Sequence, residues 1–250
     1  MSPREDAPTG QAPVLSITRV SAGYGSAAIL REVSFTVNAG EAVAILGRNG
    51  AGKTTLLRSI MGIVKPNSGD VVLEGEKMLT GLRPDQVATA GLGYVPQGRG
   101  IFRKLSVREN LQIAQYSHRV PATCIDESLA LFPALGPLLE RAGGALSGGQ
   151  QQILALARAM VGRPKVLLLD EPSEGLQPSI IDEILATLTA LCERKQCCVL
   201  LVEQNLDFAG ALAKRGYVLE MGRIARELDE QALAASEQLA RALIVMDREA

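Results

Sequence analysis

The sequence is poor in the residue types on which several common functions depend. Its 250 residues include no tryptophan, one histidine and only 3% aromatic residues, so we do not expect a platform on which nucleic-acid bases stack. The formal net charge is −1, from 26 basic and 27 acidic residues. That balance gives no polycationic surface of the kind that neutralises nucleic-acid phosphates, and we therefore expect no nucleic-acid partner.

Long apolar runs are missing as well. No stretch reaches the roughly 18 apolar residues that predict a membrane-spanning helix, and Met1–Asp6 lacks the apolar core of a signal peptide. If the protein acts in transport, we expect the translocation path to belong to other chains. The cysteines, Cys124, Cys192, Cys197 and Cys198, lack the spacing of a metal site, so we interpret them as small packing residues in a reducing cytosol.

A glycine-rich loop is the strongest feature that the sequence does contain. The apolar run Val43–Leu46 predicts a buried parallel strand, and the next residues match G-x-x-x-x-G-K-[ST] before a helical apolar pattern begins. The expected nucleotide-binding residues are Gly47, Arg48, Asn49, Gly50, Ala51, Gly52, Lys53, Thr54 and Thr55. Glycines let backbone N–H groups approach an anion, and the helix N-terminus favours negative charge. We expect Lys53 to reach the β- and γ-phosphates and the Thr54 hydroxyl to hold Mg²⁺.

Two adjacent carboxylates follow a second apolar run. Val166–Leu169 predicts a central strand, and Asp170 and Glu171 come directly after it. Carboxylates at the end of a buried strand are costly unless a cation or a water-filled site receives them. We interpret Asp170 as the Mg²⁺-side acid and Glu171 as the general base that orients the attacking water. Taken alone, the pattern also fits a strand followed by a solvated acidic turn.

Together with a third string, these two motifs make the chain resemble the nucleotide-binding subunit of an ABC transporter over residues 14–222. The glycine loop matches the family's Walker A motif, Val166–Glu171 matches its Walker B motif, and Leu146–Gln150 reads LSGGQ, its signature. The resemblance implies that Gln97, the family's Q-loop glutamine, contacts Mg²⁺ and water. It also implies that Tyr24 stacks on adenine, although a half-buried turn aromatic is the plainer interpretation.

The signature residues have a physical role that agrees with this resemblance. Ser147, Gly148, Gly149 and Gln150 precede or open a predicted helix, whose first N–H groups are available to an anion. In the family that anion is the γ-phosphate of ATP bound to the opposite subunit. The resemblance therefore implies an ATP- and Mg²⁺-dependent hydrolase that works as a pair of subunits. By itself, Ser-Gly-Gly-Gln also fits a flexible turn that caps a helix.

Departures from the family pattern suggest a branch. Gln204 stands where the family places its switch histidine, and it can bridge a phosphate oxygen and a backbone group but cannot take a proton. The histidine that the chain does have, His118, lies in the helical region and is expected on the surface. Residues 202–205, Val-Glu-Gln-Asn, resemble the smaller ATPase of importers for branched-chain amino acids and amides. Residues 173–180 look most like urea-type members, so urea, short amides and branched-chain amino acids all remain possible cargoes.

The resemblance also implies partners and a location. We expect a second ABC ATPase subunit in a heterodimer or homodimer, two membrane permeases, and an indirect link to a periplasmic substrate-binding protein. Peripheral attachment to the cytoplasmic face of the inner membrane follows. Arg99, Ile101 and Phe102 are candidates for the permease-docking rim, or form a plain loop. The rival interpretations are a soluble ABC ATPase of translation or repair, a non-enzymatic nucleotide-sensing module, and a P-loop kinase or GTPase.

The expected fold class is α/β. A P-loop, RecA-like core with a mostly parallel sheet is predicted to carry an antiparallel β subdomain and an inserted α-helical subdomain at about residues 98–164. Ser106–Glu109 is a capping-box pattern that opens a helix of this insertion. Residues 1–13 are predicted to be a disordered tail and residues 14–250 a single nucleotide-binding domain. Short C-terminal helices are expected to present Leu239, Leu243 and Met246 on one face.

Overall fold

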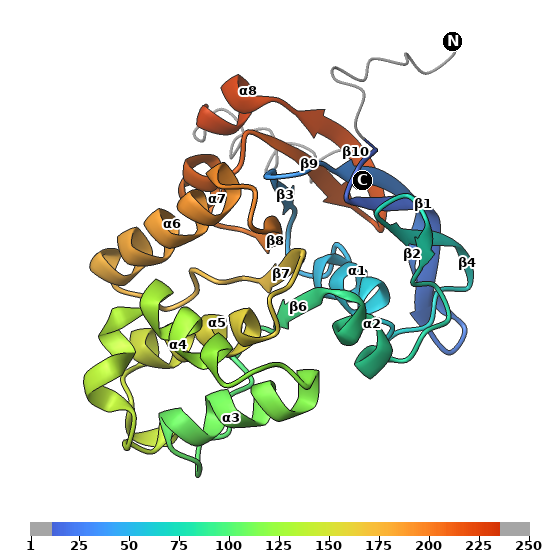
Figure 1. Cartoon of the computed structure of the whole chain (residues 1–250). Coiled ribbons are helices and arrows are strands. Elements are labelled where there is room, and N and C mark those ends of the chain that lie inside the picture. The colour runs from blue at the N-terminus through green and yellow to red at the C-terminus, as the bar shows by residue number, and fades with distance from the viewer. Residues whose placement is uncertain (1–11, 236–250) are drawn as a thin grey trace.

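The computed structural model describes residues 12–235, in which strands and helices alternate along much of the chain (Figure 1). The strands are β1 Leu15–Tyr24, β2 Ala27–Val37, β3 Ala42–Leu46, β4 Ser68–Leu73, β5 Lys77–Met78, β6 Leu92–Val95, β7 Val166–Asp170, β8 Cys198–Glu203, β9 Arg215–Glu220 and β10 Arg223–Leu228. The helices are α1 Lys53–Ile60, α2 Pro84–Ala90, α3 Val107–His118, α4 Thr123–Leu131, α5 Gly148–Val161, α6 Pro178–Glu193, α7 Leu206–Leu212 and α8 Glu230–Ala234, with 3-10 turns η1 Pro133–Leu138 and η2 Gly143–Ala145. The predicted tail up to residue 11 and the face of Leu239, Leu243 and Met246 lie outside the described residues.

The central sheet has six strands in the order β10-β9-β3-β8-β7-β6. Strands β6, β7, β8, β3 and β9 run parallel, and β10 pairs antiparallel with β9 at one edge. The predicted α/β class with a mostly parallel core is therefore confirmed. In such a sheet all parallel strands end at one edge, which is where ligands bind in this architecture.

The buried strands divide their side chains between two hydrophobic clusters. In β3, Ala44 and Leu46 belong to one cluster, while Val43 and Ile45 belong to the other. This alternation follows from the two-residue period of a strand, whose successive side chains point to opposite faces. Because both faces are covered, the strands need unbroken apolar sequence, which is why Val43–Leu46 was recognisable without structural information.

An antiparallel sheet lies beside the core. Its four strands follow the order β2-β1-β4-β5, with Leu15 opposite Val37 and Leu73. Leu15, Val37 and Leu73 are fully buried in the cluster that also contains α1 residues. The predicted antiparallel subdomain is confirmed.

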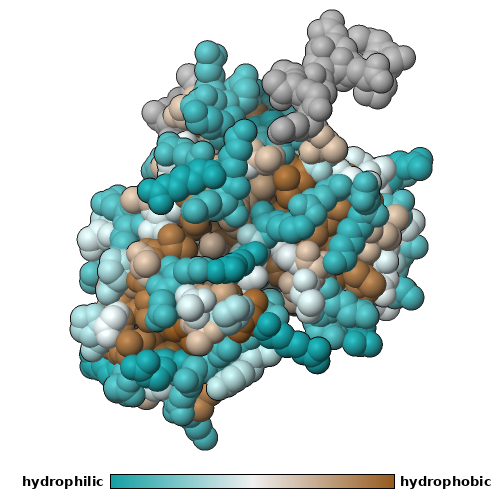
Figure 2. Space-filling model, viewed as in Figure 1, coloured by the Kyte–Doolittle hydropathy of each residue, from teal (hydrophilic) through white to brown (hydrophobic). Residues whose placement is uncertain are grey.

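The inserted helical elements are α3, α4, η1, η2 and α5, and they form the lower lobe in Figure 1. Helix α3 begins with the predicted capping box, in which the Ser106 hydroxyl accepts from Glu109 N and the Glu109 carboxylate accepts from Ser106 N. Such a cap contributes about 1 kcal/mol to helix stability. Figure 2 shows apolar surface gathered over the lower lobe, where Figure 1 places α4 and α5.

The structure corrects the prediction about the exposure of His118. His118 is half-buried at the end of α3, and its ring lies against Gly162, so the expectation of a surface residue was wrong. Burial lowers the pKa of His118.

Cys197 and Cys198 are buried, and burial raises the pKa of both thiols, as expected for unreactive packing residues. Between residues 12 and 235, the chain has no helix whose length and apolarity would let it span a bilayer.

Candidate functional site

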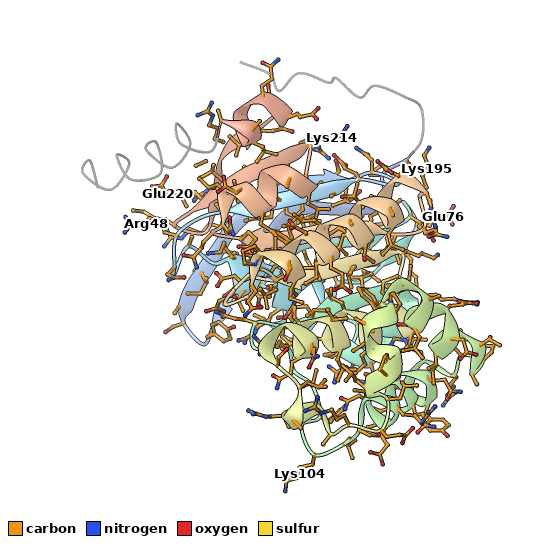
Figure 3. The ribbon with its side chains drawn as sticks, turned by 90° about the vertical axis from the view of Figure 1, so that its left-hand side faces the viewer. Arg48, Glu76, Lys104, Lys195, Lys214 and Glu220 are labelled. Atoms are coloured by element: carbon orange, nitrogen blue, oxygen red, sulfur yellow. The ribbon has the colours of Figure 1, made fainter. Side chains whose placement is uncertain are left out.

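The carboxyl ends of three neighbouring strands bring the sequence motifs together. The loop after β3, the two acids after β7 and the switch segment after β8 meet at one edge of the sheet because the three strands are parallel and adjacent. Figure 3 shows Arg48 of the loop on the same side of the core as Glu220 at the end of β9. Lys195, which precedes β8, lies on the opposite side, and Lys104 lies at the tip of the helical lobe.

The glycine loop has the backbone shape that an anion cradle needs. Gly50 and Gly52 have φ angles of 83° and 109°, which residues with a Cβ rarely adopt. A Cβ on Gly47 would lie 2.5 Å from the Leu219 carbonyl oxygen. Helix α1 starts directly after the loop without a side-chain cap on its first N–H groups. The loop and the helix end together can therefore surround a phosphate with N–H donors.

A cleft of about 330 Å³ lies over this loop. Its lining is Ile29, Arg48, Asn49, Gly50, Gly52, Lys53, Thr54, Thr55, Gln97 and Glu171. The sequence predicted all of these except Ile29, whose position in β2 gave no chemical signal. The cleft therefore joins the glycine loop to the presumed base and to the Q-loop glutamine.

Lys53 is held inside the loop. Its side chain is 5% exposed, and Nζ donates to the carbonyl oxygens of Gly47 at 2.7 Å and Arg48 at 3.2 Å. Nζ also lies 3.3 Å from Glu171 Oε1. The Glu171 carboxylate compensates the charge of the buried ammonium, and the two carbonyls accept hydrogen bonds from it in the lining of the cleft.

Asp170 is a buried carboxylate surrounded by hydroxyl groups. It is 2% exposed, and it accepts from Thr54 Oγ1 at 3.0 Å and from Tyr94 Oη at 3.2 Å. Burial raises the pKa of the Asp170 carboxyl, and these two hydrogen bonds partly oppose the rise. The buried Asp170 carboxylate and the neighbouring Thr54 hydroxyl together offer the hard oxygen ligands that Mg²⁺ prefers. Tyr94 was not identified as a site residue from the sequence.

Glu171 stands in a strained backbone conformation. Its φ angle is 48°, in the left-handed region that non-glycine residues adopt only under constraint. Its N–H donates to the Val202 carbonyl at 2.9 Å, which ties the end of β7 to β8. The side chain is mostly buried, at 11% exposed. The strained backbone conformation of Glu171 therefore accompanies the position of its carboxylate at the cleft.

Two glutamines hold the Glu171 carboxylate. Gln204 Nε2 donates to Glu171 Oε1 at 2.7 Å and to Asn49 Oδ1 at 2.8 Å. Gln97 Nε2 donates to Glu171 Oε2 at 3.2 Å and to Glu174 Oε2 at 3.1 Å. The sequence placed Gln97 on Mg²⁺ and Gln204 on the phosphate. In this structure both amides contact the Glu171 carboxylate, and Gln97 also contacts Glu174, which the sequence did not single out; the roles toward Mg²⁺ and phosphate stay predictions.

Tyr24 ends β1 and is 49% exposed. Its hydroxyl lies 3.5 Å from Arg58 Nη1, and this hydrogen bond is the largest cause of the raised pKa of Arg58. A half-exposed aromatic ring is available for stacking on a flat ligand. This exposure fits both a ring that stacks on a ligand and a half-buried turn aromatic, so the stacking role of Tyr24 stays a prediction.

The signature forms the predicted helix start. Ser147 is the N-cap of α5: its hydroxyl accepts from Gln150 N at 3.3 Å, and Gln150 Oε1 accepts from Ser147 N at 3.0 Å. Gly148 and Gly149 are partly exposed. Among the described residues, none of these four lines the cleft over the chain's own glycine loop. The signature therefore lies outside that cleft, and its role toward a second subunit stays a prediction.

The presumed docking loop packs on the signature helix. Arg99 Nη1 donates to Gln151 Oε1 at 3.1 Å, and the Arg158 guanidinium lies 5.1 Å from the centre of the Phe102 ring. Phe102 remains 45% exposed, whereas Ile101 packs partly against the core. The loop is thus connected to α5 and exposes one aromatic ring, and its docking role stays a prediction.

Comparisons with known proteins agree with this geometry. The family model described as ABC transporter matches residues 30–174. A branched-chain amino acid transport ATP-binding protein of Pseudomonas aeruginosa, BraG, is 43% identical over 216 residues, which cover 84% of this chain and 91% of BraG. A probable counterpart of Archaeoglobus fulgidus, LivF, is 37% identical over 85% of this chain and 90% of its own length.

Solved structures give the same result for the fold. The ADP conformation of an ATP-binding cassette of an ABC transporter superposes with a TM-score of 0.80 at 26% identity, covering 94% of this chain and 99% of that one. A dimeric cassette in a post-hydrolysis state, bound to ADP and Pi, gives a TM-score of 0.77 at 26% identity, over 86% and 98% of the two chains. Nucleotide therefore binds to proteins of this fold and of similar sequence.

Proposed function

Because the chain belongs to the ABC transporter family and is an ABC-type ATPase, we propose that it energises the import of branched-chain amino acids. The observation that supports this cargo is the 43% identity to BraG over nearly the whole length of both chains. The sequence strings alone favoured urea or short amides. The relatives named above support the alternative cargo instead, because their printed names concern branched-chain amino acids.

We propose that ATP binds in the cleft over the glycine loop. The backbone of Gly47–Thr55 and the start of α1 surround the phosphates, and Lys53 moves from the loop carbonyls to the β- and γ-phosphate oxygens. Tyr24 stacks on adenine. The support for this arrangement is that one cleft contains the loop, Gln97 and Glu171.

The chemistry of these residues suits Mg²⁺. Thr54, Asp170 and Gln97 would hold it, since hydroxyl, carboxylate and amide oxygens are the hard oxygen ligands that this ion takes. The ion would neutralise charge that develops on the phosphates. Glu171 is the base that orients the attacking water, and Gln204 takes the place next to the γ-phosphate.

In this proposal, the Glu171 carboxylate exchanges its ion-pair partner when ATP binds. Its carboxylate is held by Lys53, Gln97 and Gln204 in the structure, so it has little capacity left to accept a hydrogen bond from water. When Lys53 turns to phosphate, Glu171 loses its cation and is free to accept from the nucleophile. This exchange links nucleotide binding to activation of the base.

The active unit contains two ATPase subunits in this proposal. Ser147–Gln150 of each subunit binds the γ-phosphate on its mate, because the chain does not turn these residues into its own cleft. The mate is a second ABC ATPase or another copy of this chain. Membrane permeases dock at the loop of Arg99 and Phe102, and a periplasmic binding protein delivers the amino acid to them. The chain thereby sits at the cytoplasmic face of the inner membrane.

Cargo is tested with the complete transporter. The chain is purified with its permeases and second ATPase, reconstituted in liposomes, and assayed with leucine-loaded binding protein. We expect leucine, isoleucine or valine to stimulate ATP hydrolysis several-fold, whereas urea does not. Stimulation by urea and not by leucine would contradict the proposed cargo. Hydrolysis with ribosomes or DNA as the stimulating partner would instead support a soluble ABC ATPase.

The stacking role of Tyr24 gives a separate prediction. Replacing Tyr24 by alanine should weaken ATP binding about threefold to tenfold, since an aromatic stack contributes about 0.5–1.5 kcal/mol. Tyr24→Phe keeps the ring and loses only the contact with Arg58, so its affinity should stay near that of wild type. Titration of a fluorescent ATP analogue measures both. Equal affinities in Tyr24→Ala and wild type would show that adenine binds elsewhere.

A further inference from the structure

A third buried carboxylate ends a strand at the site. Glu203 closes β8 and is 2% exposed. Its Oε1 accepts from Ser173 N at 3.0 Å, and its Oε2 accepts from Gln204 N at 2.9 Å and Asn205 N at 3.0 Å. Its partners are therefore backbone N–H groups from two different segments. The sequence pattern is the same as for Asp170, an acid at the end of an apolar strand, but the motifs in the sequence gave no role to Glu203.

The charge of Glu203 is needed for this arrangement. A carboxylate has acceptor sites on both oxygens and no donor, so it can bind the three N–H groups at once. An amide of the same shape would turn an NH₂ group toward at least one of these donors. Because burying a carboxylate is costly, three short charge-assisted hydrogen bonds are what make its burial tolerable.

The three N–H groups belong to segments that must stay aligned at the cleft. Ser173 begins the segment that follows Glu171, and Gln204 carries the amide that contacts the Glu171 carboxylate. Asn205 caps α7, since its Oδ1 accepts from Phe208 N at 3.1 Å. Glu203 thus joins the segment after β7 to the segment after β8, next in sequence to Gln204, whose amide contacts Glu171.

We propose that Glu203 is a positioning residue for ATP hydrolysis, which keeps the segment of Ser173 and the segment of Gln204 in register so that Gln204 meets Glu171. The inference rests on the proposed roles of Glu171 and Gln204. Glu203 does not touch nucleotide in this scheme. It lines a separate small cavity of about 120 Å³ with Gly47, Arg48, Gln204 and Leu206.

The test is Glu203→Gln in the full-length chain. We expect kcat to fall about tenfold or more, because small displacements of catalytic groups have large effects on rate, while the KM and the Kd for ATP change less than about threefold. Hydrogen exchange should become faster at the amides of Ser173, Gln204 and Asn205. Exchange in the interior of β8 should stay slow, which separates lost positioning from general loosening of the fold.

Glu41→Gln is the matched control. Glu41 is a half-buried carboxylate that accepts from Arg215 and from Asn38 N, just before β3 and away from the cleft. Its replacement should lower the unfolding temperature with kcat within about twofold of wild type. If Glu203→Gln does not fold, Glu203→Asp serves instead, since it keeps the charge but withdraws the oxygens by one methylene.

The proposal would be overturned by a kcat within about twofold of wild type, by a Kd for ATP that rises in parallel with the loss of kcat, or by an equal kcat loss in Glu41→Gln. Unchanged exchange at Ser173 would also overturn it. Failure of the site assignment is distinguishable, because it would appear as unimpaired turnover in Glu171→Gln, whatever Glu203→Gln does.

Discussion

Glu171→Gln is expected to lower the rate of ATP hydrolysis by about two to four orders of magnitude, the usual contribution of a general base. The amide keeps the shape of the side chain, but its one oxygen can accept from only one of the two glutamines, Gln97 or Gln204. The other contact re-forms only if that glutamine turns its own carbonyl oxygen toward the new NH₂ group. The new amide cannot accept a proton from water or carry the charge that aligns it. ATP therefore binds without being consumed, and the two-subunit form should accumulate.

Nucleotide affinity provides a second readout of the same variant. Glu171 Oε1 lies 3.3 Å from Lys53 Nζ, and binding of ATP has to replace that ion pair. Glu171→Gln removes the competing carboxylate, so ATP should bind as tightly as to wild type or tighter. Single-turnover hydrolysis and size-exclusion chromatography with ATP measure the two effects.

The control for this variant is Glu174→Gln. Glu174 is exposed and also accepts from Gln97, at 3.1 Å, but it does not contact Lys53 or Gln204 among the interactions described above. Its replacement should change kcat less than about threefold, within the range expected for an exposed polar contact. Turnover near wild type in Glu171→Gln would show that another group is the base.

Lys53→Ala is expected to weaken ATP binding by about tenfold to a hundredfold, which corresponds to the loss of charge-assisted hydrogen bonds to the phosphates. The side chain is buried, and its ammonium donates to the carbonyl oxygens of Gly47 and Arg48 in the loop. Its loss also leaves Glu171 without a cationic partner, so the carboxylate repels the incoming phosphates.

Isothermal titration with ATP under non-hydrolysing conditions measures this loss. Lys65→Ala removes the same charge from an exposed position shortly after α1 and should bind ATP like wild type. Thermal unfolding without nucleotide shows whether Lys53→Ala is folded. Unchanged affinity in a folded Lys53→Ala protein would contradict the assignment of the glycine loop as the phosphate cradle.

Features of local sequence were predictable because their physics is local. The strand at residues 43–46 is apolar without interruption because both of its faces are buried, and the glycines after it adopt φ angles that other residues avoid. The capping boxes at Ser106 and Ser147 use residues only three positions apart. Each of these signals lies within one short segment, so the sequence contains it whole.

Contacts between segments were predicted less well. Tyr94 and Asp170 are 76 positions apart, and Gln204 and Asn49 are 155 positions apart, so only strand order brings either pair together. The sequence identified Gln97 and Gln204 as site residues. It gave no means of deciding that both amides contact Glu171 in the absence of a phosphate, since an amide can use either its donor or its acceptor.

The sequence by itself determined that this protein has a glycine-rich loop after a buried strand, a pair of acids, a helix-capping signature and a mostly parallel sheet, because glycine geometry, strand burial and helix capping depend on neighbouring residues. Tertiary structure alone decided which groups hold the Glu171 carboxylate in place and that Glu203 joins the segments after β7 and β8. The reason is that hydrogen bonds between distant segments depend on the order and register of the strands, which local residue patterns do not specify.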